Sequence, residues 1–154
     1  MDPFHSVKGA RVTFANVGLL LPAQWVNITD TLPEGSPPTL AVETGFGALQ
    51  FSVANYVSGA DPTIDGKALE HLLYQFEDSH DFNRSASPVT WGNGSVFGLF
   101  CDYPQDDQFI RVWYCSDGRN TAFVTYVADP LASSDSIRQE LTEADSIVRS
   151  LQFH

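Results

Sequence analysis

The chain has 154 residues, with 19 acidic against 8 basic side chains and a net charge of −11 at neutral pH. A field of this sign repels nucleic acid and anionic lipid and speeds encounter with a basic protein, so the charge argues against the first two classes of partner. Solubility alone is the plain alternative explanation for it. Hydrophobic residues make up 43% and charged residues 18%. This composition is typical of a globular chain and predicts one domain over residues 1–154, with an ordered core of about 10–153.

The sequence shows no pattern of membrane insertion or secretion. Its longest early apolar run, VGLLLPAQWV, is broken by Pro22 and is shorter than the ~20 residues that span a bilayer. The first residues lack a basic stretch followed by an apolar core. We therefore expect a cytoplasmic protein. In that compartment Cys101 and Cys115, which are not directly opposed in their two expected strands, are expected to stay reduced.

Three extended stretches precede any helical pattern: residues 9–22, read as one strand ending at Pro22, residues 24–29, and residues 40–56, read as two strands. The proline-rich residues 30–39 between them predict a loop. The turn at Thr44–Gly47 contains Gly45 and Gly47, which we expect to supply a permissive backbone. In the following strand Leu49, Phe51 and Val53 alternate with polar or small residues, which predicts a strand with one face against a helix.

A first helix follows, and the sequence offers two starts for it. Asp61 with Pro62 fits a helix start, while Gly66 moves the regular helix nearer to Asp65. Four apolar residues then recur at helical spacing on one face: Leu69, Leu72, Leu73 and Phe76. Residues 79–95 predict a polar connection with a short strand around Val89–Trp91.

Three strands in succession, residues 96–103, 109–116 and 121–129, predict an antiparallel meander. The turn at residues 117–120 reads DGRN, a strong hairpin signal because glycine accepts the positive φ that such turns require. A second helix follows, with Ser133 or Ser134 as its cap. Its apolar seam is Ile137, Leu141, Ala144, Val148 and Leu151. The order of elements predicts an α+β fold, an antiparallel sheet with helices packed on it.

Four stretches carry a resemblance that extends from about Val12 to Phe153: LLLPAQWVNIT, GALQFSV, FIRVWYCSDGRNTAFVTYVA and ADSIVRSLQF. They resemble the PsbP-like group of small bacterial α/β domains, which includes the DcrB-like proteins. The resemblance implies an α/β/α sandwich used mainly to bind other proteins. Some relatives act as type VI secretion adaptors that hold hydrophobic segments of effectors, and others accompany toxins as cognate inhibitors. The group has no shared catalytic motif, so no functional residue carries over.

Motifs of catalysis and cofactor binding are missing from the sequence. No G-x-S-x-G elbow, phosphate-binding glycine loop, C-x-x-C pair or H-E-x-x-H motif occurs. The spacing of His71 and His80 matches no known metal-ligand pattern, and solvated surface is the ordinary explanation for it. We therefore expect no enzyme, no cofactor and no metal. A small hydrolase using paired carboxylates is the least favoured alternative.

The acidic residues that gather at a helix end and at a hairpin tip suit a binding surface better. Nearby aromatic residues offer anchors, and a charged rim steers association. The predicted partner-binding residues are Glu77, Asp78, Asp81, Trp91, Asp102, Tyr103, Asp106, Asp107 and Phe109. A solvated turn is the plain alternative for the hairpin tip. We expect a protein-binding module, most concretely an immunity protein that occludes the active cleft of a basic toxin. The alternative is a secretion adaptor that binds an apolar helix in a groove.

Overall fold

The computed structural model describes residues 9–60, 62–129 and 134–154. Its elements run in the order β1 (Gly9–Phe14), β2 (Val17–Pro22), β3 (Trp25–Asn27), the 3-10 turn η2 (Thr29–Thr31), β4 (Thr39–Val42), β5 (Gly47–Ala54), α1 (Gly66–His80), β6 (Val89–Asn93), β7 (Val96–Pro104), β8 (Phe109–Ser116), β9 (Thr121–Ala128), α2 (Ser134–Arg149) and β10 (Gln152–Phe153). The α+β class predicted from the sequence is confirmed.

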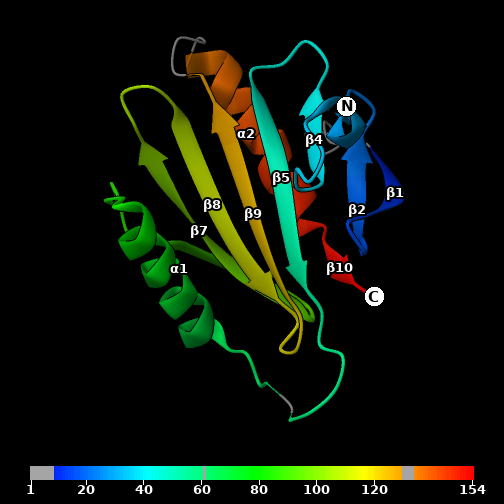
Figure 1. Ribbon diagram of the computed structural model, residues 1–154, viewed down its shortest axis with the longest axis vertical. Coiled ribbons are helices and arrows are strands. Elements are labelled where there is room, and N and C mark those ends of the chain that lie inside the picture. The colour runs from blue at the N-terminus through cyan, green and yellow to red at the C-terminus, as the bar shows by residue number, and fades with distance from the viewer. Residues whose placement is uncertain (1–8, 61, 130–133) are drawn as a thin grey trace.

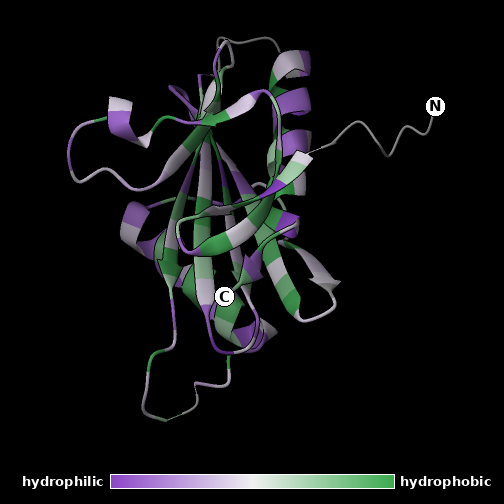
Figure 2. Cartoon of the chain, turned by 90° about the vertical axis from the view of Figure 1, so that its right-hand side faces the viewer, coloured by the Kyte–Doolittle hydropathy of each residue, from purple (hydrophilic) through white to green (hydrophobic). Residues whose placement is uncertain are grey.

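Within the described residues the strands form two antiparallel sheets (Figure 1). Seven strands pair in the order β3-β4-β5-β9-β8-β7-β6, and a small sheet has the order β1-β2-β10. The predicted meander of β7, β8 and β9 forms the centre of the large sheet, and Gly118 in its second turn has φ of 99°. Figure 2 shows hydrophobic residues gathered along the strands of the protein.

A helix covers each face of the large sheet, as the PsbP-like resemblance implies. On one face, Leu49 and Phe51 share a buried cluster with the seam of α2 and with the small sheet. On the other face, Leu69 and Leu73 of α1 pack against residues of β7 and β8. Leu49 and Phe51 therefore support the fold by packing beneath α2. Ile147, which the predicted seam of α2 left out, is also fully buried.

The strand predicted over residues 9–22 is wrong, because the chain reverses in its middle. Ala15 and Asn16 have φ of 54° and 66°, and this left-handed pair joins β1 to β2 as a hairpin. Asparagine tolerates this conformation but alanine rarely adopts it, so the turn carries only half of its usual sequence signal. The short strand β10, which pairs with β2, was not predicted either.

The structure decides between the two starts of the first helix. Asp65 is the N-cap, with its side chain accepting a hydrogen bond from Ala68 N at 2.9 Å, and α1 begins at Gly66. The helix ends at His80, and its C-cap is Asp81, a non-glycine residue with φ of 56°. For α2, the first proposed cap, Ser133, lies outside the described residues, and the helix begins at the second, Ser134.

A buried carboxylate explains the two glycines at the β4–β5 turn. Glu140 of α2 is only 6% exposed and accepts hydrogen bonds from Phe46 N, Gly47 N and the Tyr126 hydroxyl at 2.8, 3.1 and 2.8 Å. A Cβ atom at residue 45 would collide with the Glu140 side chain, and one at residue 47 with the Tyr126 ring. Neither glycine has positive φ, so the expectation that they serve backbone freedom is wrong. They provide space.

We predict that Glu140→Gln lowers the free energy of unfolding by about 1–3 kcal/mol, because the amide NH2 replaces one acceptor oxygen and then faces a backbone donor, Phe46 N or Gly47 N. Urea unfolding followed by circular dichroism measures the change. Glu34→Gln, in an exposed loop, is the matched control and should stay within about 0.5 kcal/mol of the parent chain. Equal unfolding midpoints for the two variants would contradict the role given to Glu140.

Candidate partner-binding surface

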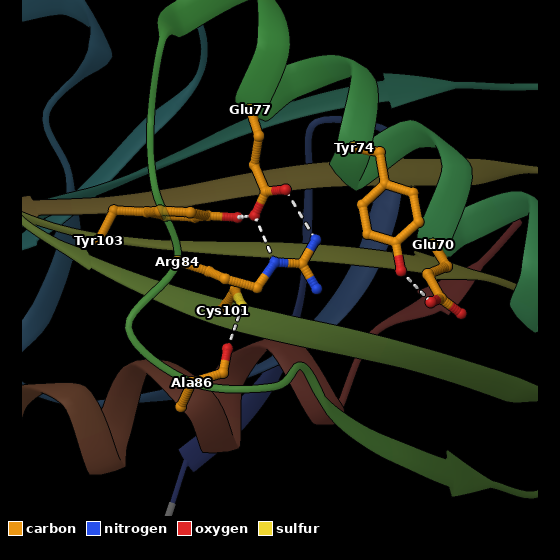
Figure 3. A network of polar contacts seen from close by, with 7 residues as sticks. All are labelled: Glu70, Tyr74, Glu77, Arg84, Ala86, Cys101 and Tyr103. Atoms are coloured by element: carbon orange, nitrogen blue, oxygen red, sulfur yellow. Dashed lines mark hydrogen bonds and ion pairs between the residues drawn. The ribbon is translucent and has the colours of Figure 1, made fainter.

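One hydrogen bond brings the two predicted acidic clusters to the same end of the molecule. The Tyr103 hydroxyl, near the end of β7, donates to Glu77 Oε2 in the last turns of α1 at 2.6 Å (Figure 3). Phe76 and Phe82 stack beside the Tyr103 ring with centroid distances of 6.0 and 5.6 Å. The C-terminal end of α1 is therefore fastened next to the β7–β8 hairpin, whose tip follows Tyr103 by two residues.

Glu77 also forms an ion pair with Arg84 beside this hydrogen bond. Arg84 donates from Nε and Nη2 to the two Glu77 oxygens at 2.9 and 2.7 Å, and its guanidinium lies 4.6 Å from the centroid of the Tyr74 ring. The side chain of Glu77 is 12% exposed. The hydrogen bond to Glu77 raises the pKa of Arg84, while burial and then Glu77 raise the pKa of the Tyr103 hydroxyl. Both Glu77 oxygens are therefore engaged within the fold, where they hold the connection after α1 in place.

Asp102 likewise forms an ion pair within the fold. Arg111 of β8 donates from Nε and Nη2 to its two oxygens at 2.6 and 3.0 Å, directly across the β7–β8 pair. The Arg111 guanidinium also lies 4.1 Å from the centroid of the Phe100 ring. Because the pair is bidentate and partly shielded, the charge of Asp102 is largely balanced by Arg111.

The expectation that aromatic residues form exposed anchors is wrong for Tyr103, which is fully buried. Alternation along β7 directs its side chain toward α1 with Leu99 and Cys101. Phe109 and Trp91 are half-buried and pack against the other core cluster. Arg149 lies 5.1 Å from the centroid of the Trp91 ring, and the Trp91 Nε1 is buried without a hydrogen-bond partner in the described part of the chain.

Four of the nine predicted residues are exposed: Asp78, Asp81, Asp106 and Asp107. We call these four residues the acidic end. Their carboxylates have no hydrogen-bond or ion-pair partner among the described residues. The two neighbouring cations, Arg84 and Arg111, are bound to Glu77 and Asp102, so they do not offset the negative charge of the acidic end.

A hollow of about 700 Å³ that sequence reasoning did not locate lies on the half of the sheet that α1 leaves open. Val26, Ala41, Ala48 and Val127 form one row across four strands of this face. Together with Phe46 they are called the apolar groove. Val26, Phe46 and Val127 are 39, 44 and 36% exposed. Alternation along each strand predicts the face of the sheet on which each residue lies, but only the order of the strands shows that these residues are neighbours.

The two thiols are free and buried, as expected. Cys101 lies opposite Val112 and Cys115 opposite Gly98, so neither faces the other across the β7–β8 pair. Burial raises the pKa of both, that of Cys115 to about 12. Among the described residues, no three potential metal ligands lie together, and no helix is long and apolar enough to cross a membrane.

Comparison with known proteins supports the fold alone. The whole chain is similar to the solution structure of cyanobacterial PsbP (CyanoP) from Synechocystis sp. PCC 6803, with a TM-score of 0.55 and 10% identity over 97% of that chain. No protein-family model matches the sequence, and neither does any curated protein. The chain thus has a PsbP-like fold, and the likeness transfers no residue role.

We predict that Tyr103→Phe costs about 1 kcal/mol of unfolding free energy, because it removes the hydrogen bond between β7 and α1. Amides in the last turns of α1 should also exchange faster with solvent. Tyr74→Phe is the matched control, since the Tyr74 side chain is exposed and its hydroxyl donates to Glu70 on the same helix. The prediction fails if both variants leave exchange in α1 unchanged.

We also predict that stability falls at alkaline pH. Above pH 9 the Cys115 thiol of the unfolded chain loses its proton, while the folded chain keeps it until about pH 12. The unfolded state then binds fewer protons, so this thiol lowers stability by about 1.4 kcal/mol per pH unit in that window. Denaturant unfolding between pH 8 and 11 measures how the free energy of unfolding changes with pH. Its decrease should be shallower for Cys115→Ala than for the parent chain. Identical slopes would contradict the prediction.

Proposed function

We propose that this chain is a protein-binding module that captures a basic protein through the acidic end. In its most concrete form it is an immunity protein, which covers the active cleft of a basic toxin with Asp78, Asp81, Asp106 and Asp107. The observation that carries the proposal is the placement of these four unpaired carboxylates on two elements fastened together by the bond between Tyr103 and Glu77.

Charge and rigidity support this proposal together. A net charge of −11 accelerates encounter with a basic surface, and a local excess of unpaired carboxylates orients that encounter. Because α1 and the β7–β8 hairpin are fixed to each other, the carboxylates need little ordering when a partner binds, which limits the entropic cost.

We propose binding rather than catalysis, because the polar groups nearest the acidic end already form ion pairs and hydrogen bonds with one another. Glu77 is held by Arg84 and Tyr103, and Asp102 by Arg111. We also place the protein in the cytoplasm, where free and buried thiols such as Cys101 and Cys115 are the ordinary state.

The test is capture from native lysate at low and at high salt, with mass spectrometry of the retained proteins. We expect the parent chain to retain a basic protein at low salt and to release it at high salt. Asp81, Asp106 and Asp107 are changed together to asparagine, which should abolish retention. The control removes the same number of exposed acids elsewhere, as Asp30→Asn, Glu34→Gln and Glu43→Gln, and should retain the protein. Equal retention by both variants would overturn the proposed surface.

A second candidate function rests on the apolar groove. An adaptor that holds an apolar helix of a secreted effector needs an exposed apolar channel, and Val26, Phe46 and Val127 provide one. In the same capture experiment an adaptor retains its partner at both salt concentrations and loses it when Val127→Asp places a charge in the groove. Retention lost only in the acidic-end variant would exclude this second function.

A further inference from the structure

A second hollow lies at the opposite end of α1 from the acidic end. It has a volume of about 450 Å³ and is enclosed by the first turns of α1 and by strands β6 and β7. Leu69, Phe97 and Leu99 give it an apolar lining. Thr90 of β6 and two α1 residues of opposite charge, Lys67 and Glu70, also lie around it. This volume is within the range of pockets that bind small ligands or large side chains.

Strand β6 beside this pocket has an unpaired edge. In the described residues it pairs only with β7, from Val89 opposite Phe100 to Asn93 opposite Val96, and it ends the order of the seven-stranded sheet. An outermost strand presents a row of backbone N–H and C=O groups that no strand satisfies. Proteins usually protect such edges with charges, prolines or bulges. The sequence of β6, VTWGN, contains no charge and no proline, and Val89 is 46% exposed.

The charge distribution marks the same place. Residues 85–101 contain no charged side chain, although the chain carries −11 in total. The segment is bounded by Arg84 and Asp102, which are both engaged in ion pairs. A partner that binds along β6 therefore meets a neutral edge, and complementarity favours a neutral extended segment over the basic surface that suits the acidic end.

We propose that β6 accepts an uncharged, extended peptide segment of another protein as an eighth strand of the large sheet. Backbone hydrogen bonds to the free edge hold the peptide, and one aliphatic or aromatic side chain on the α1 side enters the 450 Å³ pocket. Side chains alternate between the two faces of a strand, so the residues on either side of that anchor point away from the pocket. This site is separate from the acidic end and does not depend on its function.

The test uses a seven-residue peptide of alternating threonine and valine with a central leucine, acetylated and amidated. It is titrated into the full chain and followed by amide NMR shifts. Two N-methylated versions are compared with it, one methylated on its odd and one on its even residues. Only one edge of an added strand faces β6, so we expect one version to bind like the parent peptide and the other about tenfold or more weakly. The shifted amides should belong to β6 and to residues 66–70.

A variant of the chain tests the pocket. Thr90→Trp fills it and should weaken the parent peptide about tenfold or more, whereas Thr13→Trp, at an exposed position of β1, should not. Absence of shifts at millimolar peptide overturns the proposal, and so does equal weakening by both methylation patterns or a shift map centred on the apolar groove. Dimerisation of the chain alone that Thr90→Trp abolishes would assign the edge to a second copy, and it also overturns the proposal. The peptide comparison stands without any variant of the chain.

Discussion

The large sheet depends on hydrogen bonds from its aromatic side chains to carboxylates on the inner side of α2. The face of the sheet beneath α2 is built from large aromatic side chains, and burying them is favourable only if their polar atoms keep hydrogen bonds. Trp113 Nε1 donates to Asp145 at 3.0 Å, Trp25 Nε1 to Glu143 at 2.8 Å, and the Tyr126 hydroxyl to Glu140 at 2.8 Å. These bonds set the position of α2 along three separate strands.

The Glu140 carboxylate also determines the shape of a surface some distance from the core. Because it binds Phe46 N and Gly47 N as well as Tyr126, it fixes the turn that carries Phe46 to the edge of the apolar groove. The same turn can approach Glu140 of α2 and the Tyr126 ring of β9 only where residues 45 and 47 lack a Cβ atom. A buried acid and two glycines thus position the exposed Phe46. A substitution at any of these three residues should therefore change the shape of the apolar groove.

The acidity of the chain therefore has two physical origins that its composition does not separate. Glu140, Glu143, Asp145, Glu77 and Asp102 are structural acids, each bound to a donor within the fold. Asp78, Asp81, Asp106 and Asp107 stand in solvent. The net charge of −11 describes the field felt by a distant molecule, but only exposed acids such as this second set are available to a molecule in contact.

Periodicity predicted the parts of the fold that packing decides. The meander, the seam of α2 and the stripe of α1 were predicted correctly because burial of one face imposes a regular spacing. The β1–β2 hairpin was missed because Ala15 takes a conformation that its residue type disfavours. At the candidate surface, the sequence identified the exposed aspartates but not the pairing of Glu77 with Arg84 or the burial of Tyr103. Both features depend on which strand and helix ends are neighbours in space, and no local sequence pattern predicts that.

The two ends of α1 now have different surroundings, and this bears on how the molecule can act. Near its C-terminus the helix borders four unpaired carboxylates, and near its N-terminus it borders a neutral strand edge with an apolar pocket. Leu69 and Leu73 anchor the helix between these two regions at 1 and 0% exposure. Sites separated by a rigid, well-packed element usually contribute additively to binding. On the two proposals made above, a basic surface binds at one end and an extended neutral segment at the other, and a partner that carried both would gain avidity set by the distance between the sites.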